Sequence, residues 1–251
     1  MTGVGATRRI TVVNPNTSDA LTATITAAAR AVAPVGTTLV GVHPDAGVPS
    51  VESHAEEAVA AVGVLQVVRD HDADTDAFVV ACFGDTGVAA ARELATGPVV
   101  GMTEAALQTA CLVAHRFAVI TLPPRTIAHT DRVVAALGLA HRCTVAAVDV
   151  AVLDLEDGAA AELAAFTREG RRLVADGAEA IVLGCAGLAE LVEPLGRALG
   201  VPVIDGVAAA VGLAAGLLAQ GLTTSTAGTY ARIAHPGPVL TTTTTATAGE
   251  H

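Results

Sequence analysis

Short apolar segments rich in valine and isoleucine alternate along the chain with longer segments rich in alanine and leucine. Short apolar runs are typical of strands buried on both faces of a parallel sheet, and the longer segments are typical of helices. The expected strands are 9–13, 37–42, 77–82, 98–101, 117–121, 143–148, 180–184 and 202–204. The expected helices are 18–33, 53–69, 87–94, 104–114, 125–137, 159–176, 188–199 and 205–220. The alternation predicts an α/β architecture with right-handed crossovers.

The second half of this pattern repeats the first. Cys82 and Cys185 have the same separation as the segments GPVVGMTEAA at 97 and GVPVIDGVAAA at 200, and ITVVNPNT at 10 resembles FAVITLPPRT at 117. We infer two similar lobes, each with a four-stranded parallel sheet flanked by helices, related by a pseudo-twofold axis. We assign 1–112 to lobe 1 and 113–204 to lobe 2, expect a helical segment 205–230 to return to lobe 1, and expect the threonine-rich tail 237–251 to be disordered.

Two of the four cysteines stand at the ends of expected strands, and each precedes a turn that contains glycine. Cys82 is followed by FGDTG and Cys185 by AGLAE. Ligands of open parallel sheets bind at the carboxyl ends of the strands, where backbone N–H groups and helix amino termini favour negative charge. We therefore expect both thiols to ionise more readily than an ordinary cysteine, and to face each other across a cleft between the lobes.

Two facing thiols predict a 1,1-proton transfer. One thiolate removes a proton from one face of a carbon acid, and the opposite thiol returns a proton to the other face. Backbone N–H groups would stabilise the enolate between these steps, and the reaction requires no metal or organic cofactor. Core packing is the alternative for either cysteine alone. It is the expected role of Cys111 and Cys143, which no glycine turn follows.

At this point the chain resembles the aspartate/glutamate/hydantoin racemase superfamily, and within it the hydantoin and allantoin racemases. The matching segments are NPNTS at 14–18, ACFGDTG at 81–87, PVVGMTEAA at 98–106, FAVITL at 117–122 and VLGCAGL at 182–188. The resemblance implies a cofactor-independent racemase of two flavodoxin-like lobes, with the active site between them and Cys82 and Cys185 as catalytic residues. Thr86 and the Pro123–Pro124 loop depart from the family pattern, which affects the expected loop shape and the substrate preference.

The resemblance also implies a set of substrate-binding residues. These are Asn16, Thr17, Phe83, Gly84, Asp85, Thr121, Ala186 and Gly187. Asn16 and Thr17 would contact a carbonyl or carboxylate-like group, although they equally fit a helix-capping turn. The glycine and alanine positions, with Asp85, would supply backbone N–H groups. We expect the Asp85 carboxylate to cap a helix, because a negative charge beside a thiolate base would raise the pKa of that thiol.

Composition limits the partners. A net charge of −11 and a pI near 5.0 argue against nucleic acid. No apolar segment is suited to a signal peptide or a membrane span, so a cytoplasmic protein is expected. The eight histidines are scattered, and the cysteine spacing is not that of a zinc site, so no metal centre is predicted.

The sequence therefore predicts an enzyme that inverts the α-carbon of a 5-monosubstituted hydantoin or of allantoin. The alternatives are an aspartate/glutamate-type amino-acid racemase, a maleate-isomerase-like or decarboxylase-like enzyme, and a two-lobed binding protein without activity. Amino-acid racemases of the family carry Asn–Thr and Thr–His where this chain has Phe83–Gly84 and Ala186–Gly187, which favours a less charged substrate. The expected partners are a small molecule and further copies of the chain in a homo-oligomer.

Overall fold

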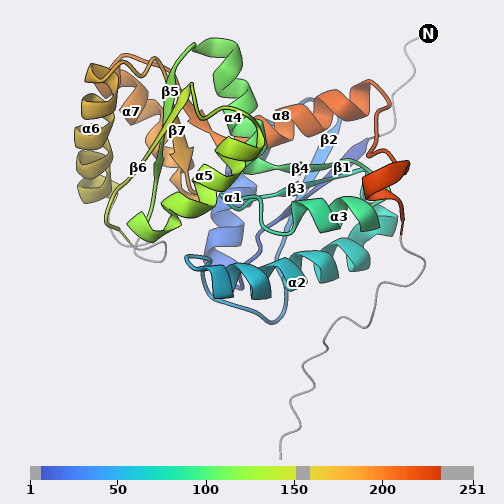
Figure 1. The fold of residues 1–251 in the computed structure, drawn as a ribbon. Helices are drawn as coiled ribbons and strands as arrows, with labels where there is room; N and C mark the ends of the chain where they lie inside the picture. The colour runs from blue at the N-terminus through green and yellow to red at the C-terminus, as the bar shows by residue number, and fades with distance from the viewer. Residues whose placement is uncertain (1–6, 151–158, 233–251) are drawn as a thin grey trace, which may run out of the picture.

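The computed structural model describes residues 7–150 and 159–232, and within them the expected alternation of strands and helices is present (Figure 1). The strands are β1 (Arg8–Val13), β2 (Thr37–Val42), β3 (Ala77–Val80), β4 (Val99–Gly101), β5 (Phe117–Thr121), β6 (Cys143–Ala147), β7 (Ile181–Gly184) and β8 (Val203–Asp205). The α-helices are α1 (Asp19–Ala31), α2 (His54–His71), α3 (Val88–Leu94), α4 (Met102–Val113), α5 (Ile127–Ala136), α6 (Ala159–Ala175), α7 (Val192–Leu199) and α8 (Gly206–Ala219). Short 3-10 segments include η2 (Pro124–Thr126), η4 (Ala186–Leu191) and η5 (Gly228–Tyr230).

The strands form two four-stranded sheets with the same internal order. Lobe 1 contains the order β2-β1-β3-β4 and lobe 2 the order β6-β5-β7-β8. Every pairing in the two sheets is parallel. The predicted α/β fold with two four-stranded parallel sheets is confirmed, and the matching strand order agrees with the repeat seen in the sequence.

Strand β3 is shorter than predicted and ends two residues before Cys82. Its last paired residue, Val80, lies between Val13 of β1 and Gly101 of β4, and neither neighbouring strand continues the ladder. One further bond follows, from the Ala81 N–H to the Val13 carbonyl at 2.9 Å. Cys82 therefore lies in the loop beyond the sheet rather than in the strand.

All four residues of β3 are buried because both faces of the first sheet are covered. Ala77 and Val79 belong to the core cluster that contains residues of α8, whereas Phe78 and Val80 pack with residues of α2 and α3. This alternation follows from the two-residue repeat of a strand. It explains why the sequence shows a continuous apolar run.

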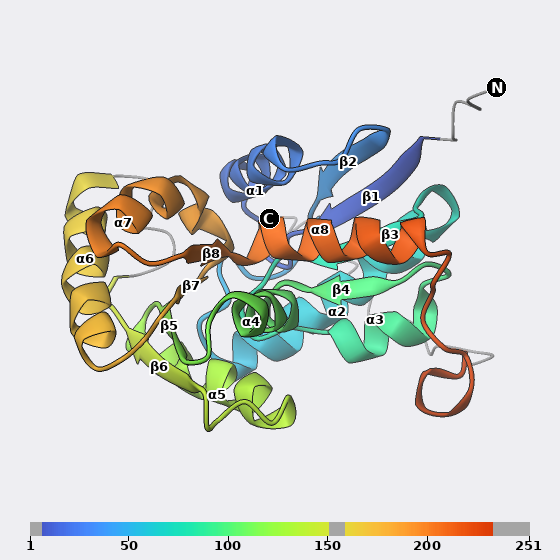
Figure 2. The same ribbon diagram turned by 90° about the horizontal axis from the view of Figure 1, so that it is seen from above.

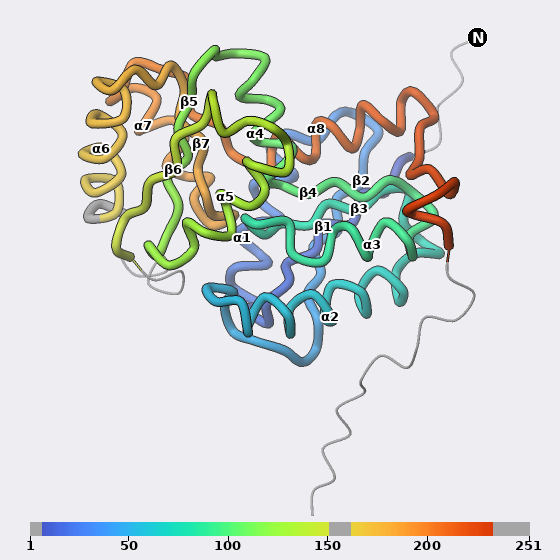
Figure 3. The backbone as a smooth tube through the Cα atoms, in the orientation of Figure 1, coloured from blue at the N-terminus to red at the C-terminus, as the bar shows by residue number. Residues whose placement is uncertain are grey.

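Helix α8 follows the last strand of lobe 2 but packs on the sheet of lobe 1. Val207, Ala210 and Val211 share a buried core cluster with Ile10 and Val12 of β1. Figure 2 shows α8 running beside α4 and along the first sheet, and Figure 3 shows the same path in the backbone trace. A Cβ atom on Gly206 would lie 2.6 Å from Cε of Met102 and 3.1 Å from the Met102 carbonyl oxygen, so any larger residue here would have to displace Met102.

The predicted tail, 237–251, lies outside the described residues. Among the helices within 7–150 and 159–232, none combines the length and the hydropathy of a membrane-crossing segment.

Candidate active site

The carboxyl ends of the two central strands of each sheet surround a single pocket of about 460 Å³, part of which is open to solvent. Residues after β1 and β3 line it from lobe 1, and residues at the ends of β5 and β7 line it from lobe 2. Cys82 and Cys185 both belong to the lining. The structure therefore brings the two cysteines together at one pocket, although they are far apart in the chain.

Six of the residues singled out from the sequence line this pocket, and four do not. Those in the lining are Asn16, Cys82, Phe83, Thr121, Cys185 and Ala186. Those outside it are Thr17, Gly84, Asp85 and Gly187. The lining also contains polar residues that the sequence did not single out, Asn14 and Thr126, and apolar ones such as Leu21, Val51 and Leu122.

The side chain of Asn16 is held by a small buried network. Its Oδ1 accepts hydrogen bonds from Asn14 Nδ2 at 2.7 Å and from the Ser18 N–H at 3.0 Å. Asn14 Nδ2 is also 2.9 Å from Thr22 Oγ1 on α1. Asn16 Nδ2 has no hydrogen bond with another described residue, so it is left as a donor at the pocket. The cap of α1 is Ser18, whose side chain accepts from the Leu21 N–H.

Thr17, which was expected to contact the substrate, lies outside the pocket lining and is hydrogen-bonded to another loop. Its hydroxyl donates to the Val48 carbonyl at 3.3 Å, and its backbone N–H donates to the same oxygen at 3.0 Å. Thr17 therefore anchors the loop between β2 and α2 to the loop after β1. The loop between β2 and α2 contains Val51, which lines the pocket.

The backbone N–H groups of Gly84 and Asp85, which were expected to face a ligand, are already hydrogen-bonded within the protein. The Gly84 N–H donates to Thr103 Oγ1 at 2.7 Å, and the Asp85 N–H donates to the Cys82 carbonyl at 3.1 Å. These bonds stabilise the tight turn in which Asp85 adopts a φ of 55°. Lobe 1 therefore presents side-chain groups, rather than this pair of backbone groups, to the pocket.

The Asp85 carboxylate caps a helix, as predicted, but the helix is α4 rather than the adjacent α3. It accepts the Thr103 N–H at 2.8 Å and the Glu104 N–H at 2.9 Å. Burial raises the pKa of Asp85 to about 6, and the two backbone bonds oppose that rise. Glu104, in the first turn of α4, forms an ion pair with Arg92 of α3. Neither carboxylate lines the pocket.

Both thiols are harder to ionise than an ordinary cysteine, contrary to the expectation from helix amino termini. Burial raises the pKa of Cys82 to about 12, and the Thr86 hydroxyl, 3.4 Å from its sulfur, opposes the rise. Burial raises the pKa of Cys185 to about 11, opposed by the backbone N–H groups of Gly187 and Ala186. Desolvation between the two lobes thus outweighs the local dipoles.

Thr86 is a functional candidate that the sequence marked only as a departure from the family pattern. It is buried, and its hydroxyl is the hydrogen-bonding group beside Cys82. Its position four residues after the cysteine, within a turn, was the available signal. On the other lobe, Thr121 and Thr126 share a hydrogen bond of 2.8 Å, and Leu122 and Thr126 bring the proline-containing loop into the lining.

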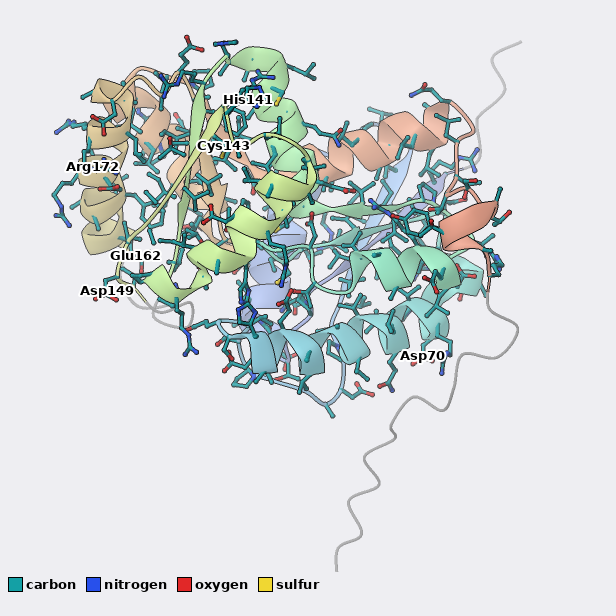
Figure 4. The ribbon with its side chains drawn as sticks, in the orientation of Figure 1. Asp70, His141, Cys143, Asp149, Glu162 and Arg172 are labelled. Carbon is teal, nitrogen blue, oxygen red and sulfur yellow. The ribbon has the colours of Figure 1, made fainter. Side chains whose placement is uncertain are left out.

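The other two cysteines pack in the core, as predicted. Cys111 and Cys143 are half-buried and lie against one apolar cluster that includes Phe117 and Val119. Figure 4 shows Cys143 at the amino end of β6 and Asp149 beyond its carboxyl end, which is the end of the sheet where the pocket lies. Cys143 is thus at the wrong end of its strand to reach the pocket.

The histidines are not all scattered, which corrects the sequence prediction. His54 on α2 and His129 on α5 have ring centroids 4.4 Å apart, and Glu57 lies beside both. The His129 side chain is almost completely buried. This group lies outside the pocket lining but next to the Cys82 loop, because a Cβ atom on Gly84 would be 3.4 Å from Cβ of His129.

Known proteins are similar to this chain in sequence and in fold over most of its length. The family model described as Asp/Glu/Hydantoin racemase matches residues 10–214. A hydantoin racemase from Rhizobium meliloti is 42% identical over 88% of this chain and 93% of its own length. The structure of an allantoin racemase from Klebsiella pneumoniae has a TM-score of 0.88 and 47% identity, covering 92% of this chain and 96% of that one.

A second solved structure gives the same result. The allantoin racemase from Pseudomonas fluorescens also has a TM-score of 0.88, with 41% identity over 92% of this chain and 99% of that one. These matches span both sheets and both cysteine loops, and they confirm the resemblance drawn from the NPNTS, CFGD and LGCAG segments. The chain therefore belongs to the Asp/Glu/hydantoin racemase family.

Proposed function

We propose that this racemase inverts the stereocentre of a 5-monosubstituted hydantoin or of allantoin by proton transfer between Cys82 and Cys185. The observation that carries the proposal is that the two thiols line one pocket from opposite sheets. Relatives with 42% and 47% identity carry the names hydantoin racemase and allantoin racemase. Proton transfer through both faces of a carbon needs one acid/base group on each side.

The proton balance of the reaction closes on the two sulfurs. One thiolate takes the proton from the ring carbon and becomes a thiol, and the electron pair moves into the adjacent carbonyl as an enolate. The opposite thiol then donates its proton to the other face and becomes the thiolate. After one turnover the protonation states of Cys82 and Cys185 are exchanged. The enzyme is then in the protonation state that acts on the opposite enantiomer.

The pocket supplies a neutral donor for the enolate oxygen or a ring carbonyl. This donor is Asn16 Nδ2, which is held in place by its network. The hydroxyls of Thr121 and Thr126 also line the pocket, but they bond to each other and Thr126 donates to the Pro123 carbonyl, so they can accept a hydrogen bond rather than donate one. Donors fixed before the reaction stabilise developing charge without reorganisation. Among the described residues that line the pocket, none is lysine or arginine. This favours a neutral ring over the carboxylates of aspartate or glutamate.

Burial raises the pKa of both thiols, and different groups oppose the rise. Two backbone N–H groups oppose it at Cys185, and one hydroxyl opposes it at Cys82. The ring carbonyls make the substrate carbon more acidic than that of a free amino acid. A thiolate with a high pKa is also a stronger base once formed, so a small population suffices.

The proposal is tested by isotope exchange in D2O. The L and D forms of several 5-substituted hydantoins and of allantoin are incubated with wild type, Cys82→Ser and Cys185→Ser, with Cys111→Ser as the matched control. We expect loss of optical rotation together with deuterium uptake in wild type and in the control, and loss of racemisation in both active-site variants. Full racemisation by either variant, or no exchange with any ring substrate, would overturn the proposal.

A further inference from the structure

We infer that His54, Glu57 and His129 form a binding site for a divalent transition-metal ion such as Zn²⁺, Co²⁺ or Ni²⁺. One ligand atom from each residue lies within 4.8 Å of the other two. Glu57 Oε2 is 3.6 Å from Nδ1 of His54 and 4.0 Å from Nδ1 of His129. Two imidazoles and one carboxylate, with a fourth position open to water, form an established set of zinc ligands.

The spacing is close to what such an ion requires. With metal–ligand distances of about 2.0–2.2 Å, neighbouring donors of a tetrahedral site lie about 3.3–3.6 Å apart. The side chain of His129 is 4% exposed and that of Glu57 is 18% exposed, so both are already held in place. The side chain of His54 is 69% exposed and is free to make the small rotation that closes the site.

Arg132 prepares Glu57 for this role. Its guanidinium binds Oε1 of Glu57 and leaves Oε2 directed to the two imidazoles. Groups that orient a ligand in this way influence metal affinity. Arg132 and the nearby Arg125 add positive charge around His129, which opposes cation binding, so the ion must be held mainly by its nitrogen ligands. Two imidazoles and one carboxylate suit an ion that binds nitrogen strongly, and not Ca²⁺ or Mg²⁺, which depend on several oxygen ligands.

An ion here would join the two lobes beside the Cys82 loop. His54 and Glu57 belong to α2 of lobe 1, whereas His129 belongs to α5 of lobe 2 (Figure 1). His129 also packs on Gly84, two residues after Cys82. Metal binding would thus fix the position of α2 relative to α5. This role is independent of the reaction proposed for the two cysteines.

Titration with Co²⁺ tests the site without any measurement of activity. Wild type should develop the visible absorption of tetrahedral cobalt with nitrogen and oxygen ligands, and its midpoint of thermal unfolding should rise as Co²⁺ is added. His54→Gln and His129→Gln should each weaken binding by at least about tenfold. His141→Gln is the matched control, because His141 is exposed at the far end of lobe 2 (Figure 4) and should bind like wild type.

Three results would overturn the inference. One is the absence of cobalt absorption in wild type at millimolar Co²⁺. Another is binding that both histidine variants retain. The third is a sulfur-to-cobalt charge-transfer band in the near ultraviolet, which would place the ion on a cysteine. If the buried His129→Gln variant fails to fold, the exposed His54→Gln variant decides the test.

Discussion

The two cysteine loops have equivalent positions in the two sheets but different chemical surroundings. Cys82 and Cys185 both follow the third strand of their lobe, and both sheets have the same strand order. In lobe 1 the Gly84 N–H donates to Thr103 and the Asp85 N–H donates to the Cys82 carbonyl, and the Thr86 hydroxyl is hydrogen-bonded to the Cys82 sulfur. In lobe 2 the backbone N–H groups of Ala186 and Gly187 serve the Cys185 sulfur. The two lobes thus agree in where each thiol lies and differ in how each is stabilised.

Removal of either thiol should have the largest effect on the rate of racemisation. Serine cannot act as a thiolate base, so Cys82→Ser and Cys185→Ser should each reduce racemisation by about 10²–10⁴-fold. The two variants should differ in which enantiomer still loses its α-proton, since each retains the base for one face. Proton NMR of the separate enantiomers in D2O measures this. Equal exchange of both enantiomers by both variants would contradict opposed roles.

The pH dependence of the wild-type enzyme follows from the raised thiol pKa values. The reaction needs one thiolate, and burial raises the pKa to about 11 for Cys185 and about 12 for Cys82. The thiolate fraction therefore increases with pH, and racemisation should rise about tenfold per pH unit between roughly pH 7 and 9. Initial rates across this range provide the measurement. A plateau starting below pH 7 would mean that an ordinary or lowered thiol pKa controls the reaction.

Loss of the Thr86 hydroxyl should affect Cys82 and leave the groups around Cys185 in place. A hydrogen bond to a charged group contributes about 1.5–3 kcal/mol, so Thr86→Val should slow racemisation by about 10–100-fold. Thr86→Ser should restore most of the rate because it keeps the hydroxyl. The alkaline limb of the rate profile should shift to higher pH in Thr86→Val alone. An unchanged profile would show that the contact with Cys82 is only structural.

The cap formed by Asp85 should affect stability more than the reaction. Asp85→Ala removes both bonds to the amino end of α4 and should lower the free energy of unfolding by about 0.5–2 kcal/mol. Racemisation at saturating substrate should change less than in Thr86→Val, because the Asp85 carboxylate bonds to backbone N–H groups of α4 whereas the Thr86 hydroxyl bonds to the Cys82 sulfur. Urea unfolding measures the first effect and steady-state kinetics the second. A rate loss comparable to that of the cysteine variants would give Asp85 a catalytic role.

Features decided by neighbouring residues could be predicted from the sequence. Apolar runs such as that of β3 mark strands buried on both faces, and the glycine turns mark the strand ends that carry Cys82 and Cys185. A capping role for Asp85 follows from the type of residue, but its position before α3 does not identify α4 as the helix that it caps. The likeness of the two sheets and the shared pocket then follow from the repeat.

Features decided by distant residues could not be predicted. The N–H of Gly84 finds Thr103, and the hydroxyl of Thr17 finds Val48, only after loops from separate parts of the chain meet. The raised thiol pKa values arise from desolvation, which requires both lobes to be in place. His54 and His129 meet for the same reason, because α2 and α5 belong to different lobes.

The path of α8 has a consequence for synthesis on the ribosome. The helix supplies Val207, Ala210 and Val211 to the core that contains Ile10 and Val12. The face of the first sheet that α8 covers therefore stays exposed until both sheets have been translated. In nascent chains that stop before Gly206, α1 and α4 cover only part of this apolar face, and the part left for α8 is exposed to chaperones and aggregation. Lobe 1, although first in the sequence, is completed last.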